Sequence, residues 1–140
     1  MSPGKPAYML DSFAMLAFVN DEGGMARVKE LLQLARDRKC RMLMCLVNLG
    51  EVLYIVERER GMPAAQSVLA LVESLPIELL EASRDLVLDA AHIKAQHALS
   101  YADTFVVAAA IREKASVITG DPEFESVEDL VEIEWLKKEE

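Results

Sequence analysis

The sequence contains no apolar run long enough to cross a bilayer, and its N-terminus lacks a charged segment followed by an apolar one. We therefore expect neither a membrane anchor nor a secretory signal, and we predict a cytoplasmic protein. The hydrophobic content of 52% argues against a disordered chain. The length of 140 residues suits one domain with a single core, in which residues 1–6 and 137–140 are expected to be flexible ends.

Basic residues are scarce relative to acidic ones. The chain has 15 Lys and Arg against 24 Asp and Glu, which gives a formal net charge of −9. This balance argues against tight sequence-independent binding to nucleic acid, because such binding depends on many Lys and Arg contacts to phosphates. It does not exclude nucleic acid as a substrate, since a bound metal ion can supply positive charge locally. The same acidity suits a basic protein partner.

Several common functional motifs are absent. Cys40 and Cys45 match no CxxC, zinc or haem pattern, so we interpret both as small apolar side chains in a reducing compartment. The sequence also has no P-loop, no GxGxxG motif and no Ser-His-Asp set. The acidic residues are therefore the main candidates for chemistry.

Short apolar runs alternate with helical patterns along the chain. We expect strands at 7–10, 41–45, 77–80, 117–119 and 130–135, and helices at 13–19, 22–38, 46–60, 64–74, 84–99 and 104–114. Ser12 is expected to cap the first helix. The first and fourth strands are apolar with little polar alternation, which is typical of a parallel sheet covered on both faces. We therefore predict an α/β fold, with a central, mostly parallel five-stranded sheet flanked by helices in a single domain.

Two acidic residues directly follow predicted strands. Asp11 comes after residues 7–10, and Asp121 comes after residues 117–119 with one glycine between. Ligands of open parallel sheets bind beyond the carboxyl ends of the strands, where the strand order reverses. If these two strands are neighbours, the two carboxylates share one cleft.

Two further acids have simpler explanations beside a functional one. Asp103 ends the segment 100–103, which matches a capping box, so it either only stabilises a helix start or also points into the cleft. Glu51 lies inside a helix on the same side as Asn48. The neighbouring Gly50 leaves two interpretations equally open: a close approach of another backbone, or a surface glutamate beside an incidental glycine.

Together these acids predict a metal site. Carboxylate oxygens suit Mg²⁺ or Mn²⁺ better than zinc or copper. A cation held in this way can activate water and neutralise a phosphodiester during an in-line displacement. The predicted ligands are Asp11, Glu51, Asp103 and Asp121.

Four stretches in order resemble the motifs of PIN-domain ribonucleases, most closely the VapC-like toxins of type II toxin–antitoxin pairs. The stretches are Met9-Leu10-Asp11-Ser12, Asn48-Leu49-Gly50-Glu51-Val52-Leu53-Tyr54, Ser100-Tyr101-Ala102-Asp103-Thr104-Phe105 and Thr119-Gly120-Asp121-Pro122-Glu123-Phe124. The resemblance covers nearly the whole chain. It implies a PIN-like fold, cleavage of RNA, and Mg²⁺ or Mn²⁺ held by the four acids. Ser12, Asn48 and Thr119 would be hydrogen-bonding groups behind the ligands.

One residue departs from the family pattern. Many members have Asp where this chain has Glu123. The longer side chain could contact the metal through water or point away, so a fifth ligand and a second metal position both stay open.

The resemblance also implies partners. It implies a homodimer, an RNA substrate, and an antitoxin protein that blocks the acidic cleft. The basic residues that could contact RNA form two groups, either Arg36, Arg38, Lys39 and Arg41 or Arg58 and Arg60, although such runs are more often solvated faces. Two alternatives stay open beside a toxin nuclease: a stand-alone PIN nuclease in RNA processing, and a non-catalytic PIN-like interaction module.

Overall fold

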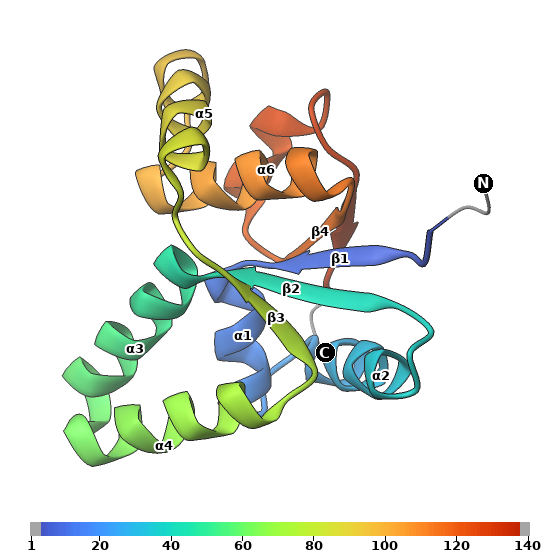
Figure 1. Ribbon diagram of the computed structural model, residues 1–140. Helices are drawn as coiled ribbons and strands as arrows, with labels where there is room; N and C mark the ends of the chain where they lie inside the picture. Colours follow the sequence, from blue (N-terminus) through green and yellow to red (C-terminus); the bar gives the residue numbers. More distant parts are fainter. Residues whose placement is uncertain (1–3, 138–140) are drawn as a thin grey trace.

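The computed structural model describes residues 4–137, and its centre is a five-stranded sheet (Figure 1). The strands are β1 (Ala7–Leu10), β2 (Arg41–Cys45), β3 (Ile77–Leu80), β4 (Ser116–Thr119) and β5 (Ile133–Trp135). Their order is β3-β2-β1-β4-β5, and all four neighbouring pairs are parallel. The predicted α/β fold with a five-stranded sheet is confirmed, and the sheet is parallel throughout.

Helices cover both faces of the sheet. The first layer contains α1 (Ser12–Val19), α2 (Met25–Arg36), α3 (Leu46–Arg60) and α4 (Met62–Ser74), and the second contains α5 (Arg84–Gln96), α6 (Tyr101–Glu113) and the 3₁₀ helix η1 (Pro122–Val127). Figure 1 shows α5 and α6 on one side of the strands and α1 to α4 on the other.

The structure has two hydrophobic cores, one on each face of the sheet, rather than the single core expected from the length. Two cores form because successive side chains of a strand point to opposite faces. Met9 of β1 packs into the core that contains α5 and α6, whereas the next residue, Leu10, packs into the core beneath α1 to α4. Val117 and Ile118 of β4 divide in the same way. A strand buried on both faces has to be apolar at every position, which explains the continuous apolar runs in the sequence.

The two cysteines belong to these cores. Cys40 and Cys45 are both free thiols and both buried, one in each core. Their interpretation as small apolar side chains is confirmed.

The start of α1 differs from the prediction that Ser12 caps it. The capping residue is Asp11, whose backbone is extended and whose Oδ1 accepts a hydrogen bond from the Ala14 amide at 2.7 Å. Ser12 is the first helical residue instead. Asp and Ser are about equally good caps, and β1 ends one residue before Asp11, so the helix starts at the earlier of the two.

Glycine also shortens the second predicted helix, which begins at Met25 rather than at residue 22. Gly24, the residue before it, has a φ of +95°, a left-handed conformation that glycine adopts without strain. The helix ends at Arg36 rather than at residue 38, and Arg38 itself has a φ of +61°. The remaining helix buries Val28, Leu31 and Leu32 as its periodicity predicts.

Three other boundaries in the second half were placed imprecisely. Helix α6 starts at Tyr101 rather than at residue 104, because the Ser100 side chain caps it by accepting from the Asp103 amide. Helix α5 ends at Gln96 rather than at residue 99. The last strand is limited to Ile133–Trp135, and the 3₁₀ helix η1 between the last two strands was not predicted.

Within the part of the chain that the structure describes, no helix is long and apolar enough to span a membrane. Of the ends predicted to be flexible, residues 1–3 and 138–140 lie outside the described residues. Residues 4–6 and 137 are exposed and have no regular secondary structure.

Candidate metal centre

Asp11 and Asp121 lie at the same edge of the sheet because β1 and β4 are neighbours. The two strands pair in register, with Leu10 opposite Ile118, so both chains turn away at their carboxyl ends side by side. Asp11 directly follows β1, and Asp121 follows β4 after Gly120. The condition set by the sequence, that these two strands are neighbours, is met, and it explains how residues 110 positions apart come to lie at one edge of the sheet.

Thr119 connects these two acids. The Thr119 hydroxyl donates a hydrogen bond to Oδ2 of Asp11. The oxygen of that hydroxyl, Oγ1, also accepts a hydrogen bond from the Asp121 amide at 3.0 Å. Thr119 and Asp11 are both almost completely buried. With Oδ1 bound to the Ala14 amide, both oxygens of Asp11 are fixed, so the carboxylate has one defined orientation.

Burial raises the pKa of Asp11 from its ordinary value of 3.8 to about 7. The hydrogen bonds from Thr119 and from the Ala14 amide oppose this effect, and the charges of Asp103 and Asp121 add to it. The repulsion shows that three carboxylates are within electrostatic reach of one another. Such a group is stabilised by protons or by a cation.

Asp103 reaches this group from the opposite layer. It lies in the first turn of α6 and is buried, with its amide bound to the capping Ser100 side chain at 3.2 Å. Burial raises the pKa of its carboxyl to about 6, the Ser100 hydroxyl lowers it, and the charges of Asp121, Glu51 and Glu123 raise it further. The capping arrangement is therefore real, and the same helix start also turns Asp103 toward the other acids.

The 3₁₀ helix brings Glu123 into the cluster. Asp121 caps η1 by accepting the Glu123 amide at 3.0 Å, and Pro122 occupies the first helical position. One carboxylate oxygen from each of Asp103, Asp121 and Glu123 lies within 4.8 Å of the others. The structure thus places Glu123 among the acids despite its longer side chain. The Asp-Pro pair is a common helix start that could have predicted this turn.

Glu51 and Asn48 face the start of α6 from α3. Asn48 is completely buried, and its Nδ2 donates to the carbonyl of Ala102, the residue before Asp103, at 3.0 Å. This bond fixes α3 against α6. Within residues 4–137, Oε1 of Glu51 and Oδ1 of Asn48 are buried atoms without a hydrogen-bond partner. Buried oxygens are rarely left in that state unless a ligand or water completes them.

Gly50 and Ser12, which lie next to two of these acids in the sequence, were also assigned roles from the sequence. Gly50 is exposed, and a Cβ there would have no atom within 4 Å, so the interpretation as a close approach of another backbone is wrong. Nothing in the structure explains this glycine. Ser12 is half-buried beside Asp11, and among the described residues its hydroxyl has no side-chain hydrogen bond.

The comparison with protein families agrees with this geometry. The family model of the PIN domain matches residues 8–130, which include all five acids. The chain belongs to the PIN-domain family. Members of this family are typically nucleases.

Solved structures with the same fold are VapC toxins of VapBC toxin–antitoxin systems. A chain of VapBC2 from Rickettsia felis, crystallised with a fragment of its promoter DNA, has a TM-score of 0.75 at 17% identity and covers 94% of this chain and 99% of that one. A chain of DNA-bound VapBC from Salmonella typhimurium has a TM-score of 0.72 at 20% identity, covering 92% and 97%.

A third relative is VapC20 from Mycobacterium tuberculosis, described as a toxin that cleaves the sarcin-ricin loop. It has a TM-score of 0.69 at 20% identity and covers 90% of this chain and 98% of its own. At these identities the likeness establishes the shared fold. No curated protein sequence matches the chain significantly.

Two groups of basic residues in this PIN domain lie differently relative to the acids. Arg41 begins β2, at the amino edge of the sheet, and pairs with Glu78 and Glu113. The acids lie at the opposite, carboxyl edge, and Arg41 is therefore not placed to bind a substrate there. Arg60, at the end of α3, donates to Asn20 at 3.0 Å, beside a cavity that Asn20 helps to line.

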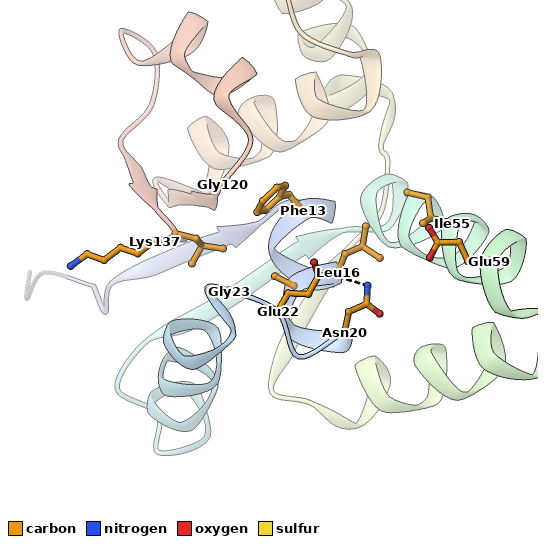
Figure 2. Close-up of a pocket in the computed structure, with 11 residues that line it drawn as sticks. Phe13, Leu16, Asn20, Glu22, Gly23, Ile55, Glu59, Gly120 and Lys137 are labelled. Carbon is orange, nitrogen blue, oxygen red and sulfur yellow. Dashed lines mark hydrogen bonds between the residues drawn. The ribbon is translucent and has the colours of Figure 1, made fainter. Parts of the chain in front are cut away.

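That cavity lies between α1, α3 and the segment after β5 (Figure 2). Its volume is about 500 Å³. The lining is mixed, with Leu16 and Ile55 among its apolar residues and Asn20 and Glu59 among its polar ones. Figure 2 shows Phe13 beside Gly120, between Lys137 and the α3 residues Ile55 and Glu59. Phe13 follows Asp11 by two residues and Gly120 precedes Asp121, so the chain segments that carry these two acids also supply part of the cavity wall.

Proposed function

We propose that this chain is a metal-dependent endoribonuclease and the toxin of a toxin–antitoxin pair. The observation that carries the proposal is the convergence of Asp103, Asp121 and Glu123, whose ligand oxygens lie within 4.8 Å of one another. Three carboxylates at this spacing repel each other, and a divalent cation offsets that repulsion. Membership of a family whose members are typically nucleases supports the same conclusion.

The residues present fit Mg²⁺ or Mn²⁺. All donors at the cluster are carboxylate oxygens, which these cations prefer, and Oε1 of Glu51 is a buried oxygen with no hydrogen-bond partner. Asp103, Asp121 and Glu123 would hold the cation, with Asp11 and Glu51 completing the site. A cation bound there would lower the pKa of a coordinated water and offset the negative charge of the phosphodiester.

The chain itself orients the acids and limits their freedom. Thr119 and the Ala14 amide hold both oxygens of Asp11, and the Asn48 side chain fixes the start of α6 that carries Asp103. Orientation of this kind matters because a phosphodiester is cleaved in line, with the attacking water and the leaving ribose oxygen on opposite sides of phosphorus. The overall reaction consumes one water molecule and divides one RNA strand into two.

The toxin role is supported by the fold. The structural neighbours from Rickettsia felis and Salmonella typhimurium were crystallised as VapBC complexes. By analogy we propose a basic antitoxin as the partner, which suits a net charge of −9. Homodimer formation and the cytoplasmic location stay predictions from the sequence.

The decisive experiment is cleavage of a mixed RNA panel by purified protein with Mg²⁺, Mn²⁺ or EDTA. We expect metal-dependent cutting that falls at least about 100-fold in Asp103→Asn, because one ligand and its charge are lost. Two matched variants on η1 distinguish the loss of a cluster acid from the loss of any negative charge on this helix. Glu123→Gln is expected to lower cutting, whereas Glu125→Gln, an exposed residue of the same short helix, is not.

The other outcomes point to the alternatives. Equal cutting by wild type and Asp103→Asn contradicts the proposed site. Absence of cutting together with absence of Mn²⁺ binding in titration calorimetry favours a non-catalytic interaction module. Metal-dependent cutting without growth arrest on expression favours a nuclease of RNA processing over a toxin.

A further inference from the structure

We propose that the ring of Phe13 is a stacking platform for a nucleobase of the RNA, next to the bond that is cut. The proposal rests on the nuclease function and adds a binding subsite to it. The acids can account for the chemistry at phosphorus, but they offer no favourable contact to the bases that flank it.

The backbone of the acidic cluster holds the ring in place. Phe13 is the second residue of α1, two positions after Asp11. A Cβ built at Gly120 would lie only 2.4 Å from Cε1 of Phe13 and 2.8 Å from its Cζ. The ring edge therefore rests directly on the Gly120 backbone, between Thr119 and Asp121. Only glycine allows this contact, which fixes the ring against the loop that carries Asp121.

The rest of the ring is accessible. Phe13 is 41% exposed, and it borders the cavity between α1 and α3 (Figure 2). The cavity combines apolar side chains with the polar groups of Asn20, Glu59 and Lys137. A nucleobase has the matching character, with two apolar faces and a polar edge. The ring thus offers an apolar face beside the acids, with polar groups within the same cavity.

The net charge of the chain favours a contact to RNA that does not depend on charge. Phosphate contacts from Lys and Arg normally supply the affinity for RNA, but this chain has a net charge of −9. Arg27, Arg41 and Arg112 are each paired with a carboxylate. Stacking on an aromatic side chain does not depend on charge and tolerates any base, because every base has a π-face.

A single exposed apolar residue is common on protein surfaces and needs no function. Phe13 differs from Ile111, which is 48% exposed on α6 and lies two turns beyond Asp103. Phe13 is held against the backbone of Gly120, whereas Ile111 lies about 12 Å along the axis of α6 from Asp103. Ile111→Ala is therefore a suitable control for loss of exposed apolar surface.

The first test is the kinetics of RNA cleavage with Mn²⁺ by Phe13→Leu and Phe13→Trp. Loss of the stacking of one nucleobase on an aromatic ring weakens binding by about 5- to 160-fold. We expect Phe13→Leu to raise KM by that factor with little change in kcat, and Phe13→Trp to match the wild type. Ile111→Ala is expected to leave both constants unchanged. A wild-type KM in Phe13→Leu overturns the platform.

An abasic substrate tests which part of the RNA the ring contacts. Once the cut site is mapped, each nucleotide around it is replaced in turn by an abasic one. At one position, the abasic RNA is expected to raise the KM of the wild type by the same factor as Phe13→Leu raises it for intact RNA. For Phe13→Leu acting on that abasic RNA, we expect KM to rise no further. Losses that multiply at every position overturn the proposal.

A binding measurement separates this proposal from the nuclease function. Trp135 is the only native tryptophan, so Phe13→Trp with Trp135→Phe places one indole at position 13. Asp103→Asn in the same protein prevents cutting. We expect a mixed-sequence 12-nucleotide RNA, with Mn²⁺ present, to quench the fluorescence, and an abasic ribose-phosphate chain of equal length not to.

The cleavage and fluorescence assays together distinguish failure of the stacking platform from failure of the nuclease function. Quenching by RNA without any cutting by the wild type would support the platform and refute the nuclease. Cutting without quenching, or a Phe13→Leu variant that loses only antitoxin binding, would refute the platform and leave the nuclease intact.

Discussion

The hydroxyl of Thr119 donates a hydrogen bond to the carboxylate of Asp11 across the pair of parallel strands β1 and β4. The same hydroxyl accepts the Asp121 amide, so one side chain holds two acids of the candidate metal centre. Because all three groups are wholly or largely buried, water cannot easily replace these bonds. The contact is therefore a sensitive position at which structure and site can be tested together.

Thr119→Val is expected to lower the free energy of unfolding by about 1–3 kcal/mol, since it leaves the Asp11 oxygen and the Asp121 amide without their partner. Thr119→Ser keeps the hydroxyl and is expected to lose less. Urea unfolding of both variants measures the difference. A valine variant as stable as the wild type would show that the hydroxyl is dispensable for stability.

The raised pKa of Asp11 predicts a stability that falls as the pH rises. Between pH 3.8 and about 7 the folded state binds more protons at Asp11 than the unfolded chain does, so the free energy of unfolding decreases over this range. The pKa difference corresponds to at most about 4 kcal/mol. Asp11→Asn removes this contribution and keeps a good helix cap.

Urea unfolding in EDTA from pH 4.5 to 8 tests this linkage. We expect the stability of the wild type relative to Asp11→Asn to decline steadily with pH, and to level off above about pH 7. A constant difference between the two proteins would mean that Asp11 titrates as an ordinary carboxyl. The pKa of Asp103 is also raised, to about 6, so the stability of both proteins depends on pH through Asp103. Only the difference in stability between the wild type and Asp11→Asn therefore reports on Asp11.

Divalent cations are expected to reverse this effect. At neutral pH, Mn²⁺ at 100 times its dissociation constant should add about 2.7 kcal/mol to the free energy of unfolding. We expect a rise in melting temperature for the wild type and for Glu125→Gln, and none for Asp103→Asn. An equal rise in all three would place the bound cation outside the acidic cluster.

Asn48 is expected to act on the site through Asp103. Asn48→Ala removes the bond to the Ala102 carbonyl and should cost about 1–3 kcal/mol, because that carbonyl is left without its donor. We also expect weaker Mn²⁺ binding, measured by calorimetry, since α6 loses its contact with α3. Gln33→Ala, an exposed amide on α2, is expected to change stability by less than about 0.5 kcal/mol. Unchanged Mn²⁺ affinity in Asn48→Ala would limit the residue to a structural role.

Gly120→Ala is expected to push the Phe13 ring away from the loop. The ring can swing outward because it is half-exposed, so we expect a loss of about 1 kcal/mol. In a Phe13→Ala background the same substitution should cost almost nothing. A double-mutant cycle of thermal unfolding measures this coupling. Additive effects would show that ring and glycine do not restrain one another.

The sequence predicted the fold, and the position of Asp11 and Asp121 after strands, because both follow from continuous apolar strands; the order that makes β1 and β4 neighbours comes from the structure. Strands buried on both faces leave a signal at every position, whereas helix starts depend on single side chains. Asp11 and Ser12 are equally good caps, so the choice between them depended on where β1 ends. The contribution of Glu123 could not be read from spacing, because η1 is a tight turn with no hydrophobic period.

Gly50 shows where a local pattern in the sequence is ambiguous. A glycine inside a helix often marks a close contact, but α3 points this position to solvent. The side chains that do approach α6 from α3 are Asn48 and Glu51, one turn apart on the opposite side. Their burial depends on the packing of two helices that are distant in sequence, which no local pattern contains.

The bond between Thr119 and Asp11 joins residues 108 positions apart, and it has a consequence for how the protein is made. Strand β1 is synthesised long before its neighbour β4, so the centre of the sheet stays open until residues 116–119 have emerged from the ribosome. A fragment from an interrupted translation that stops before Ser116 lacks β4, Asp121 and Glu123. The acids can therefore assemble only after β4 and η1 have been synthesised, which keeps the cutting activity that we propose out of fragments that lack them.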